Sequence, residues 1–151
     1  LLLASVSMGH DVSYATPIGY EPNATIIDRA NRISEETGAK IISTNDPVEA
    51  VTDAGVIYTD IFVSMGEEQM KDKYHAFDGF QINEELVANA DPDYLFMHCL
   101  PAHRGEEVTN QVIDSKNSVV FDQAENRMWG QMSLLTYMCN ENAWHTFNEL
   151  F

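Results

Sequence analysis

Basic residues are scarce in this 151-residue sequence. Eight Lys and Arg stand against 24 Asp and Glu, which gives a formal net charge of −16 at pH 7. A surface that binds nucleic acid or an anionic membrane must neutralise phosphates with a basic face, so neither is an expected partner. The carboxylates are scattered in small groups, which is typical of a solvated surface. A phosphate ester could bind only where the few Arg residues are placed for it.

Cysteines and long apolar runs are also few. Cys99 and Cys139 belong to no CxxC pair and to no Cys/His pair at zinc-finger spacing. We therefore expect free thiols in a reducing compartment, the cytoplasm or the mitochondrial matrix. The apolar run that opens the sequence is too short to cross a bilayer and lacks the Met and the basic region of a targeting signal. We expect a soluble, one-domain piece of a longer protein.

Runs of strand length alternate with helical patterns along the sequence. Asn23 and Gly38 cap one expected helix, and Asp46, Pro47 and Glu49 give the next a cap, a first-turn proline and a capping-box partner. Strands are expected at 11–16, 40–44, 56–59, 80–82, 94–98 and 118–121, and helices at 1–9, 24–37, 46–54, from about 67, 83–90, 105–114 and from about 124 onward.

This alternation predicts an α/β fold, a three-layer Rossmann-like domain with a mainly parallel sheet and helices on both faces. No G-x-G-x-x-G follows a strand, which argues against a dinucleotide-binding module. Ligands of such sheets bind beyond the carboxyl ends of the strands. Polar residues follow several of these ends, namely Asp60, His98 with Cys99, and Arg127. The sequence therefore predicts a binding site at this rim.

Four stretches of the sequence resemble one family. ATPIGYEPN, SMGEE four residues after Asp60, HCLPAHRGEEV and FDQAENR together look like the ornithine-binding domain of the ornithine carbamoyltransferases. The resemblance covers residues 1 to about 138 and leaves 139–151 as a C-terminal tail, expected to be helical. It implies that 1–138 is the second of two α/β domains, in an enzyme that forms a homotrimer or a multiple of trimers.

The resemblance also implies the reaction. The carbamoyl group of carbamoyl phosphate is transferred to the side-chain amine of L-ornithine, which gives L-citrulline and phosphate, as in arginine biosynthesis and the urea cycle. No cofactor and no metal are expected. The carbamoyl-phosphate signatures of the family, S-T-R-T and H-P-x-Q, do not occur, so we expect the carbamoyl-phosphate-binding domain to be absent. We therefore expect this chain alone to be inactive.

One part of the second domain is missing as well. The domain normally begins with a strand and a DGNN-like turn before the helix that corresponds to residues 1–9, and the sequence does not contain them. Its sheet is therefore expected to lack a central strand. An open gap between buried strands is an aggregation hazard. We take the chain to be a fragment, or a chain that another segment completes.

The resemblance implies that Asp60 and Cys99 lie close to the reacting amine of ornithine. An amine of this kind has an unperturbed pKa near about 10, so it must lose a proton before it can attack. Asp60 and Cys99 are expected to approach this amine as catalytic residues, and the backbone carbonyl of Leu100 can accept a hydrogen bond from an N–H. Cys99 and Leu100 are also expected to lie against carbamoyl phosphate.

The other assignments concern the head group and the carbamoyl oxygen. Ser64 and Met65 are expected to hold the amino-acid head group of ornithine through a hydroxyl and main-chain amides. Arg127 is expected to be catalytic and to bind the carbamoyl oxygen, where charge develops in the transition state. Arg104 is the other cation near the rim.

Each assignment has a structural alternative. Asp60 could cap a turn, Cys99 could be a small buried hydrophobe, and Arg127 could pair with Glu125 or Asp122. Ser64 and its neighbours could be an ordinary lead-in to a helix. His98 and His103 flank Cys99, but zinc would need further ligands at suitable spacing. A Cys-His hydrolase is disfavoured because adjacent residues of a strand point to opposite faces.

Alternatives at the level of function also remain. Because half of the reaction site is missing, the chain could be a noncatalytic amino-acid-binding fragment. Within the family it could act on putrescine or N-acetylornithine. The SMG element favours free ornithine.

Overall fold

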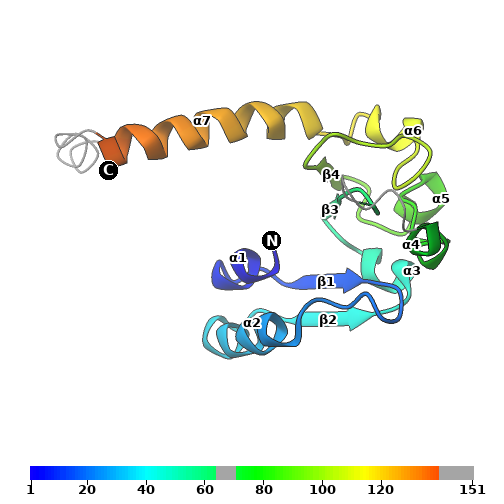
Figure 1. Ribbon diagram of the computed structural model, residues 1–151, viewed down its shortest axis with the longest axis horizontal. Helices are drawn as coiled ribbons and strands as arrows, with labels where there is room; N and C mark the ends of the chain where they lie inside the picture. Colours follow the sequence, from blue (N-terminus) through cyan, green and yellow to red (C-terminus); the bar gives the residue numbers. More distant parts are fainter. Residues whose placement is uncertain (64–70, 140–151) are drawn as a thin grey trace.

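The structure is a computed structural model that describes residues 1–63 and 71–139. It is an α/β arrangement of short parallel strands and helices, as expected (Figure 1). Its elements are α1 (Leu2–Ser7), β1 (Val12–Ala15), α2 (Ala24–Thr37), β2 (Ile41–Thr44), α3 (Pro47–Val51), β3 (Val56–Thr59), α4 (Lys71–Ala76), α5 (Glu84–Val87), β4 (Leu95–His98), α6 (Asn110–Ile113) and α7 (Val120–Cys139). The expected helix start near residue 67 lies outside the described residues.

The helix caps follow the sequence closely. Asn23 Oδ1 accepts a hydrogen bond from Thr25 N at 2.9 Å, and Gly38 ends α2 in the left-handed region with a φ of 79°. Asn83 caps α5 in the same way by accepting from Leu86 N. These polar side chains satisfy backbone groups that a helix end leaves without partners.

The expected capping box at α3 is wrong. Asp46 does cap the helix by accepting from Val48 N. The carboxylate of Glu49, however, accepts a hydrogen bond from the Thr44 hydroxyl at the end of β2. Thr44, at the end of β2, takes the place of Asp46 N as the partner of Glu49, and α3 stops at Val51, short of the expected end.

The expected strand at 118–121 does not form, because α7 already begins at Val120. Ser118 makes an isolated bridge to Phe96, and Val119 N donates to Phe96 O. Gln123 N then donates back to Val119 O, so Val120 already belongs to α7. Two adjacent valines predict a strand, but their backbone continues into the helix. The brief strand expected at 80–82 is likewise a single bridge from Ile82 to Val108.

The strands form two separate parallel pairs, β1 with β2 and β3 with β4. Each pair has its own apolar core. Val6, Ala30 and Ala39 are the buried residues of the core beside β1 and β2, whereas the larger core beside β3 and β4 is centred on Phe96. The expectation that the sheet lacks a central strand stays a prediction.

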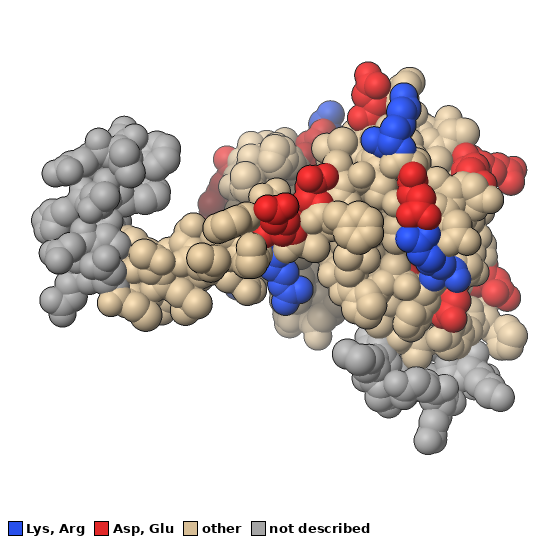
Figure 2. All heavy atoms as spheres, turned by 90° about the horizontal axis from the view of Figure 1, so that it is seen from above, with Lys and Arg blue, Asp and Glu red and all other residues tan. Residues whose placement is uncertain are grey.

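Helix α7 extends away from both pairs (Figure 1). Every residue from 124 to 139 is exposed within the described structure, including Trp129, Leu134 and Leu135. No charged residue occurs from Met128 to Cys139, and the far part of this arm is uniformly tan in Figure 2. A helix that is apolar on most sides is normally buried. None of the described helices is long and apolar enough to span a membrane.

Candidate functional site

Two strand ends create the site. β3 and β4 are parallel and in register, so that Thr59 pairs with His98, and both chains leave the strands at the same rim. Asp60 and Cys99 follow these ends directly. The Cys99 thiol lies 2.9 Å from Asp60 Oδ1 and donates a hydrogen bond to it. The structure therefore brings together the two residues that the sequence assigned to the amine.

The environment of Cys99 keeps its thiol protonated. Burial raises the pKa of Cys99, and the neighbouring Asp60 carboxylate raises it further because it accepts the S–H hydrogen bond and repels a thiolate. Burial, followed by the charge of Cys99, raises the pKa of Tyr58 as well. A thiol of this kind is a donor and not a nucleophile at neutral pH, which argues against a Cys-His hydrolase.

Asp60 keeps acceptor capacity free. Its Oδ1 also accepts from Ile61 N at 2.7 Å, which fixes the carboxylate at the start of the loop after β3. Within the described chain its Oδ2 has no hydrogen-bond partner. One oxygen is thus held by the protein and the other can accept from a ligand.

Arg127 reaches the same place from α7. A cavity of about 240 Å³ is lined by Tyr58, His98, Cys99, Gln123, Ala124 and Arg127. Arg127 makes no ion pair with any described residue, so the expected alternative pairing with Glu125 or Asp122 does not occur there. Glu125 instead accepts from Trp129 Nε1. The cavity therefore has an available cation on one wall and the Cys99 thiol on another.

The other candidate cation is already paired. Arg104 holds Asp114 with both terminal nitrogens, with Nη2 2.8 Å from Oδ1, and Nη1 also donates to Asn110 Oδ1 at 3.0 Å. This bidentate pair fastens the loop after β4 to α6. Arg104 is therefore a structural residue in this chain.

Leu100 has an unusual backbone with a φ of 53°, in the left-handed region. Its N–H donates to His98 Nδ1 at 2.9 Å, which leaves the proton of that imidazole on Nε2. Nε2 lies 3.2 Å from Glu107 Oε1, without the alignment of a hydrogen bond, and both side chains are fully buried. His98 thus holds the loop that carries Cys99 and Leu100.

Glu107 was not predicted from the sequence. It accepts a hydrogen bond from His103 N at 2.5 Å and is fully buried beside His98. The stretch HRGEEV gave a signal, since a glutamate directly before a buried valine lies close to the core. The sequence pattern predicts a short amphipathic helix over 105–114, but α6 covers only Asn110–Ile113 and Glu107 lies in the turn before it.

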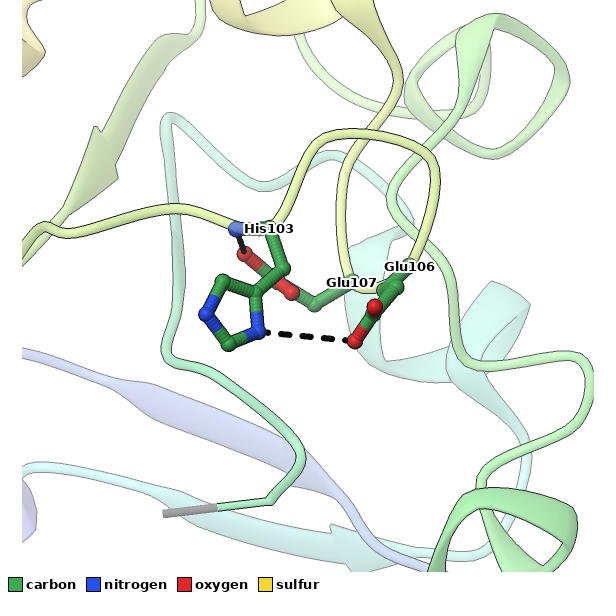
Figure 3. A group of neighbouring side chains, drawn as sticks. All are labelled: His103, Glu106 and Glu107. Carbon is green, nitrogen blue, oxygen red and sulfur yellow. Dashed lines mark hydrogen bonds and ion pairs between the residues drawn. The ribbon is translucent and has the colours of Figure 1, made fainter. Parts of the chain in front are cut away.

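Three side chains of the turn after β4 form a group that resembles a metal site. His103, Glu106 and Glu107 have ligand atoms within 4.8 Å of one another (Figure 3). His103 Nδ1 lies 3.4 Å from Glu106 Oε2, and Glu107 faces the backbone of the turn. These contacts engage His103, Glu106 and one carboxylate oxygen of Glu107, whereas Glu107 Oε2 is buried without a hydrogen-bond partner among the described residues.

The remaining candidates cannot be placed. Ser64 and Met65 lie outside the described residues. Their expected role at the head group of ornithine stays a prediction.

Comparison with known proteins gives the same picture. Residues 1–138 match the family model described as "Aspartate/ornithine carbamoyltransferase, Asp/Orn binding domain". The chain is 53% identical over 136 residues to a catabolic ornithine carbamoyltransferase of Thermoplasma volcanium, covering 89% of this chain and 45% of the relative. The chain thus spans about half the length of the curated relatives it matches.

Solved structures agree as well. The ornithine carbamoyltransferase of Pyrococcus furiosus matches with a TM-score of 0.85 and 52% identity, over 89% of this chain and 44% of that one. An acetylornithine transcarbamylase complexed with acetylcitrulline matches less well, with a TM-score of 0.71 and 27% identity over 83% and 39% of the two chains. The chain belongs to the aspartate/ornithine carbamoyltransferase family and matches its Asp/Orn-binding domain.

Proposed function

We propose that this chain supplies the ornithine-binding half of an ornithine carbamoyltransferase. The observation that carries the proposal is the Cys99–Asp60 hydrogen bond at the rim of a cavity that also contains Arg127. The complete enzyme transfers the carbamoyl group of carbamoyl phosphate to the side-chain amine of L-ornithine and releases L-citrulline and phosphate. The enzyme acts in arginine metabolism in the cytoplasm. It assembles as a homotrimer or a multiple of trimers.

Asp60 and Cys99 act on the amine. The protonated amine binds Asp60 Oδ2, which accepts no hydrogen bond from a described residue, and transfers a proton to this carboxylate. The neutral amine is then the nucleophile. The Cys99 thiol stays neutral beside it because burial and Asp60 raise its pKa. The carbonyl of Leu100 accepts one amine N–H, which helps to aim the lone pair at the carbamoyl carbon.

Arg127 acts on the other reactant. The carbamoyl oxygen gains negative charge as the amine attacks, and a guanidinium held at the cavity wall stabilises that charge. Its lack of an ion pair with described residues favours this role, because a pairing carboxylate would have to be displaced first. Ser64 and Met65 hold the carboxylate and α-amine of ornithine.

The phosphate group of carbamoyl phosphate needs cations from another domain. Among the described residues, Arg127 is the only arginine or lysine that lines the cavity. Arg104, the other candidate cation, is held by Asp114. One guanidinium cannot hold a phosphate dianion and also stabilise the carbamoyl oxygen. The partner domain that binds carbamoyl phosphate must therefore complete the site.

Replacing Asp60 tests the proposal. We fuse the chain behind the part of the Pyrococcus furiosus enzyme that it does not match and measure citrulline formation. Asp60→Asn removes the charged acceptor, and kcat/KM for ornithine is expected to fall by about 100-fold or more, since a lost charged hydrogen bond costs about 3 kcal/mol. Asp28→Asn, an exposed position on α2, is the matched control and should leave the rate unchanged.

The same assay distinguishes the possible amines. Ornithine, putrescine and N-acetylornithine are compared at matched concentrations, and ornithine is expected to react fastest. A preference for putrescine would contradict the roles of Ser64 and Met65, because putrescine has no head group. An Asp60→Asn rate within about twofold of the parent would contradict the role at the amine.

A further inference from the structure

His98 and Glu107 are buried polar side chains that the proposed mechanism does not use. His98 ends β4 and is 1% exposed, and Glu107 is fully buried directly before the core residue Val108. His98 Nε2 and Glu107 Oε2 have no hydrogen-bond partner among the described residues. Burying polar groups in this way costs free energy, so the pair calls for an explanation beyond packing.

The neighbours of His98 select one tautomer of its imidazole. Leu100 N donates to Nδ1 at 2.9 Å, so Nδ1 must carry a lone pair instead of a proton. On the other side of the ring, Nε2 lies 3.2 Å from Glu107 Oε1. A carboxylate at this distance favours a proton on the nitrogen that faces it. Leu100 and Glu107 therefore favour the same tautomer, with its proton on Nε2.

Glu107 is held in place for this contact. Its Oε1 accepts a hydrogen bond from His103 N at 2.5 Å, the contact drawn as a dashed line between these residues in Figure 3. The turn between the two residues thus keeps the carboxylate beside the imidazole. Glu107 does not line the cavity, so any effect on the reaction must pass through His98.

Leu100 depends on the unprotonated Nδ1 because its backbone is strained. Its φ of 53° lies in the left-handed region, which costs free energy for a residue other than glycine unless its surroundings hold it there. Nδ1 of His98 accepts from the N–H two residues later, in the manner of an Asx turn. A proton on Nδ1 would face that N–H and remove the acceptor. The tautomer of His98 thus decides whether Leu100 keeps this conformation.

The conformation of Leu100 affects two groups that the proposed function places at the amine. Cys99 lies between His98 and Leu100, and its thiol reaches Asp60 Oδ1 at 2.9 Å. The direction of the Leu100 carbonyl follows from the backbone angles of the same residue. A change at Leu100 therefore moves the carbonyl and the thiol relative to Asp60.

We propose that Glu107 is a positioning residue for carbamoyl transfer, which holds His98 in the tautomer that keeps Leu100 in its left-handed conformation. The proposal rests on the proposed function for the reaction itself. Glu107 touches no reactant, and it acts through His98 on the Leu100 carbonyl and the Cys99 thiol.

NMR of the 151-residue chain with ¹⁵N-labelled histidine measures the tautomer. The ¹⁵N shift of each ring nitrogen reports whether that nitrogen carries a proton, and His98 is expected to be protonated at Nε2 only. Glu107→Leu has a similar volume but no acceptor, and is expected to give a measurable fraction of the other tautomer. Glu106→Gln, at the exposed neighbour, is the matched control and should leave the His98 signals unchanged. An unchanged tautomer in Glu107→Leu would overturn the proposal.

Citrulline formation by the fusion with the unmatched part of the Pyrococcus furiosus enzyme measures the effect on the reaction. Rates are taken per folded enzyme, from the circular dichroism of each sample. Glu107→Leu is expected to lower kcat by about 10- to 100-fold and to leave KM for ornithine within about twofold, because a small misplacement costs rate while Asp60 still binds the amine. Glu106→Gln should retain both constants. An unchanged kcat in Glu107→Leu would overturn the proposal.

Two variants of His98 separate positioning from stability, and they decide the question even if Glu107→Leu does not fold. His98→Asn places an amide oxygen where it can accept from Leu100 N in an Asx turn, whereas the side chain of His98→Gln is one CH₂ longer and does not fit this turn. Both variants lack the ring, so a merely structural role predicts the same loss for both. The kcat of His98→Asn is expected to exceed that of His98→Gln by at least about tenfold. Equal values would overturn the proposal.

Failure of this inference differs from failure of the proposed function. A parent fusion that turns over ornithine, with variants that match it, would overturn the positioning role and leave the proposed function standing. A parent fusion that forms no citrulline would contradict the proposed function and, with it, the role of Glu107 in the reaction.

Discussion

At the scale of single residues, the site depends on how Asp60 controls Cys99. The thiol donates to Asp60 Oδ1 at 2.9 Å, and the carboxylate favours the protonated form both as an acceptor and as a negative charge. Cys99 is thus a neutral neighbour of the amine. A negatively charged thiolate would compete with Asp60 for the amine's proton.

Alkylation of Cys99 measures this control. Asp60→Asn is expected to lower the pKa of Cys99, because the residue that raises it after burial is lost. Iodoacetamide reacts with the thiolate, so Cys99 should be alkylated several-fold faster at pH 8 in the variant. Mass spectrometry reads Cys139 in the same sample, and its rate should not change. Slower or equal alkylation of Cys99 would contradict the pKa assignment.

Sequence patterns predicted the residues of the rim better than the contacts that hold them. Asp60 and Cys99 directly follow strand ends, and a rule about parallel sheets places such residues together. Arg127 lines the same cavity from within α7, because the strand that was expected before it did not form. The buried pair of His98 and Glu107 was missed, because the two side chains are joined by the path of the loop between them. Local periodicity carries no information about that path.

At the scale of elements, the loop after β4 depends on Glu107. The Glu107 carboxylate accepts a hydrogen bond from His103 N and lies 3.2 Å from His98 Nε2. His98 Nδ1 in turn accepts a hydrogen bond from Leu100 N. This chain of contacts connects the acidic turn to the residue that follows Cys99. The loop is therefore held from inside the core.

Replacing Glu107 should destabilise the chain. Glu107→Ala removes the acceptor of the His103 N–H and the carboxylate that faces the buried His98 Nε2, and it leaves a cavity beside His98, at an expected cost of about 1–3 kcal/mol. Glu106→Ala is the matched control, because its exposed pair with His103 is worth at most about 1 kcal/mol. Urea unfolding compares the two midpoints. Equal shifts for the two variants would show that the buried carboxylate has no special role.

Helix ends were predictable where a side chain caps its own helix, as Asn23 and Asn83 do. The predictions failed where another contact competes. The Glu49 carboxylate accepts from the Thr44 hydroxyl, five residues earlier, instead of from Asp46 N. The chain enters α7 at Val120 directly after Val119 N has donated to Phe96 O. Intrinsic propensities are small in comparison with such tertiary contacts.

At the scale of the whole molecule, the chain has surfaces that need a partner. The two strand pairs have separate apolar cores, and within the described structure α7 exposes an uncharged, largely apolar stretch from Met128 to Cys139. Both features are explained if the part of a carbamoyltransferase that this chain does not span covers them. The resemblance led to the prediction that a strand is missing, which stays a prediction, whereas the exposure of α7 was found only from the structure.

Citrulline formation by the chain with and without its other half is the most direct test. The purified 151-residue chain, given ornithine and carbamoyl phosphate, is expected to form no measurable citrulline, because proximity in a closed site can supply about 7–11 kcal/mol of the barrier and one wall is missing. Addition of the unmatched part of the Pyrococcus furiosus enzyme, with the strand that precedes the matched half, is expected to restore turnover. Robust turnover by the chain alone would contradict the conclusion that it is the ornithine-binding half of a divided site.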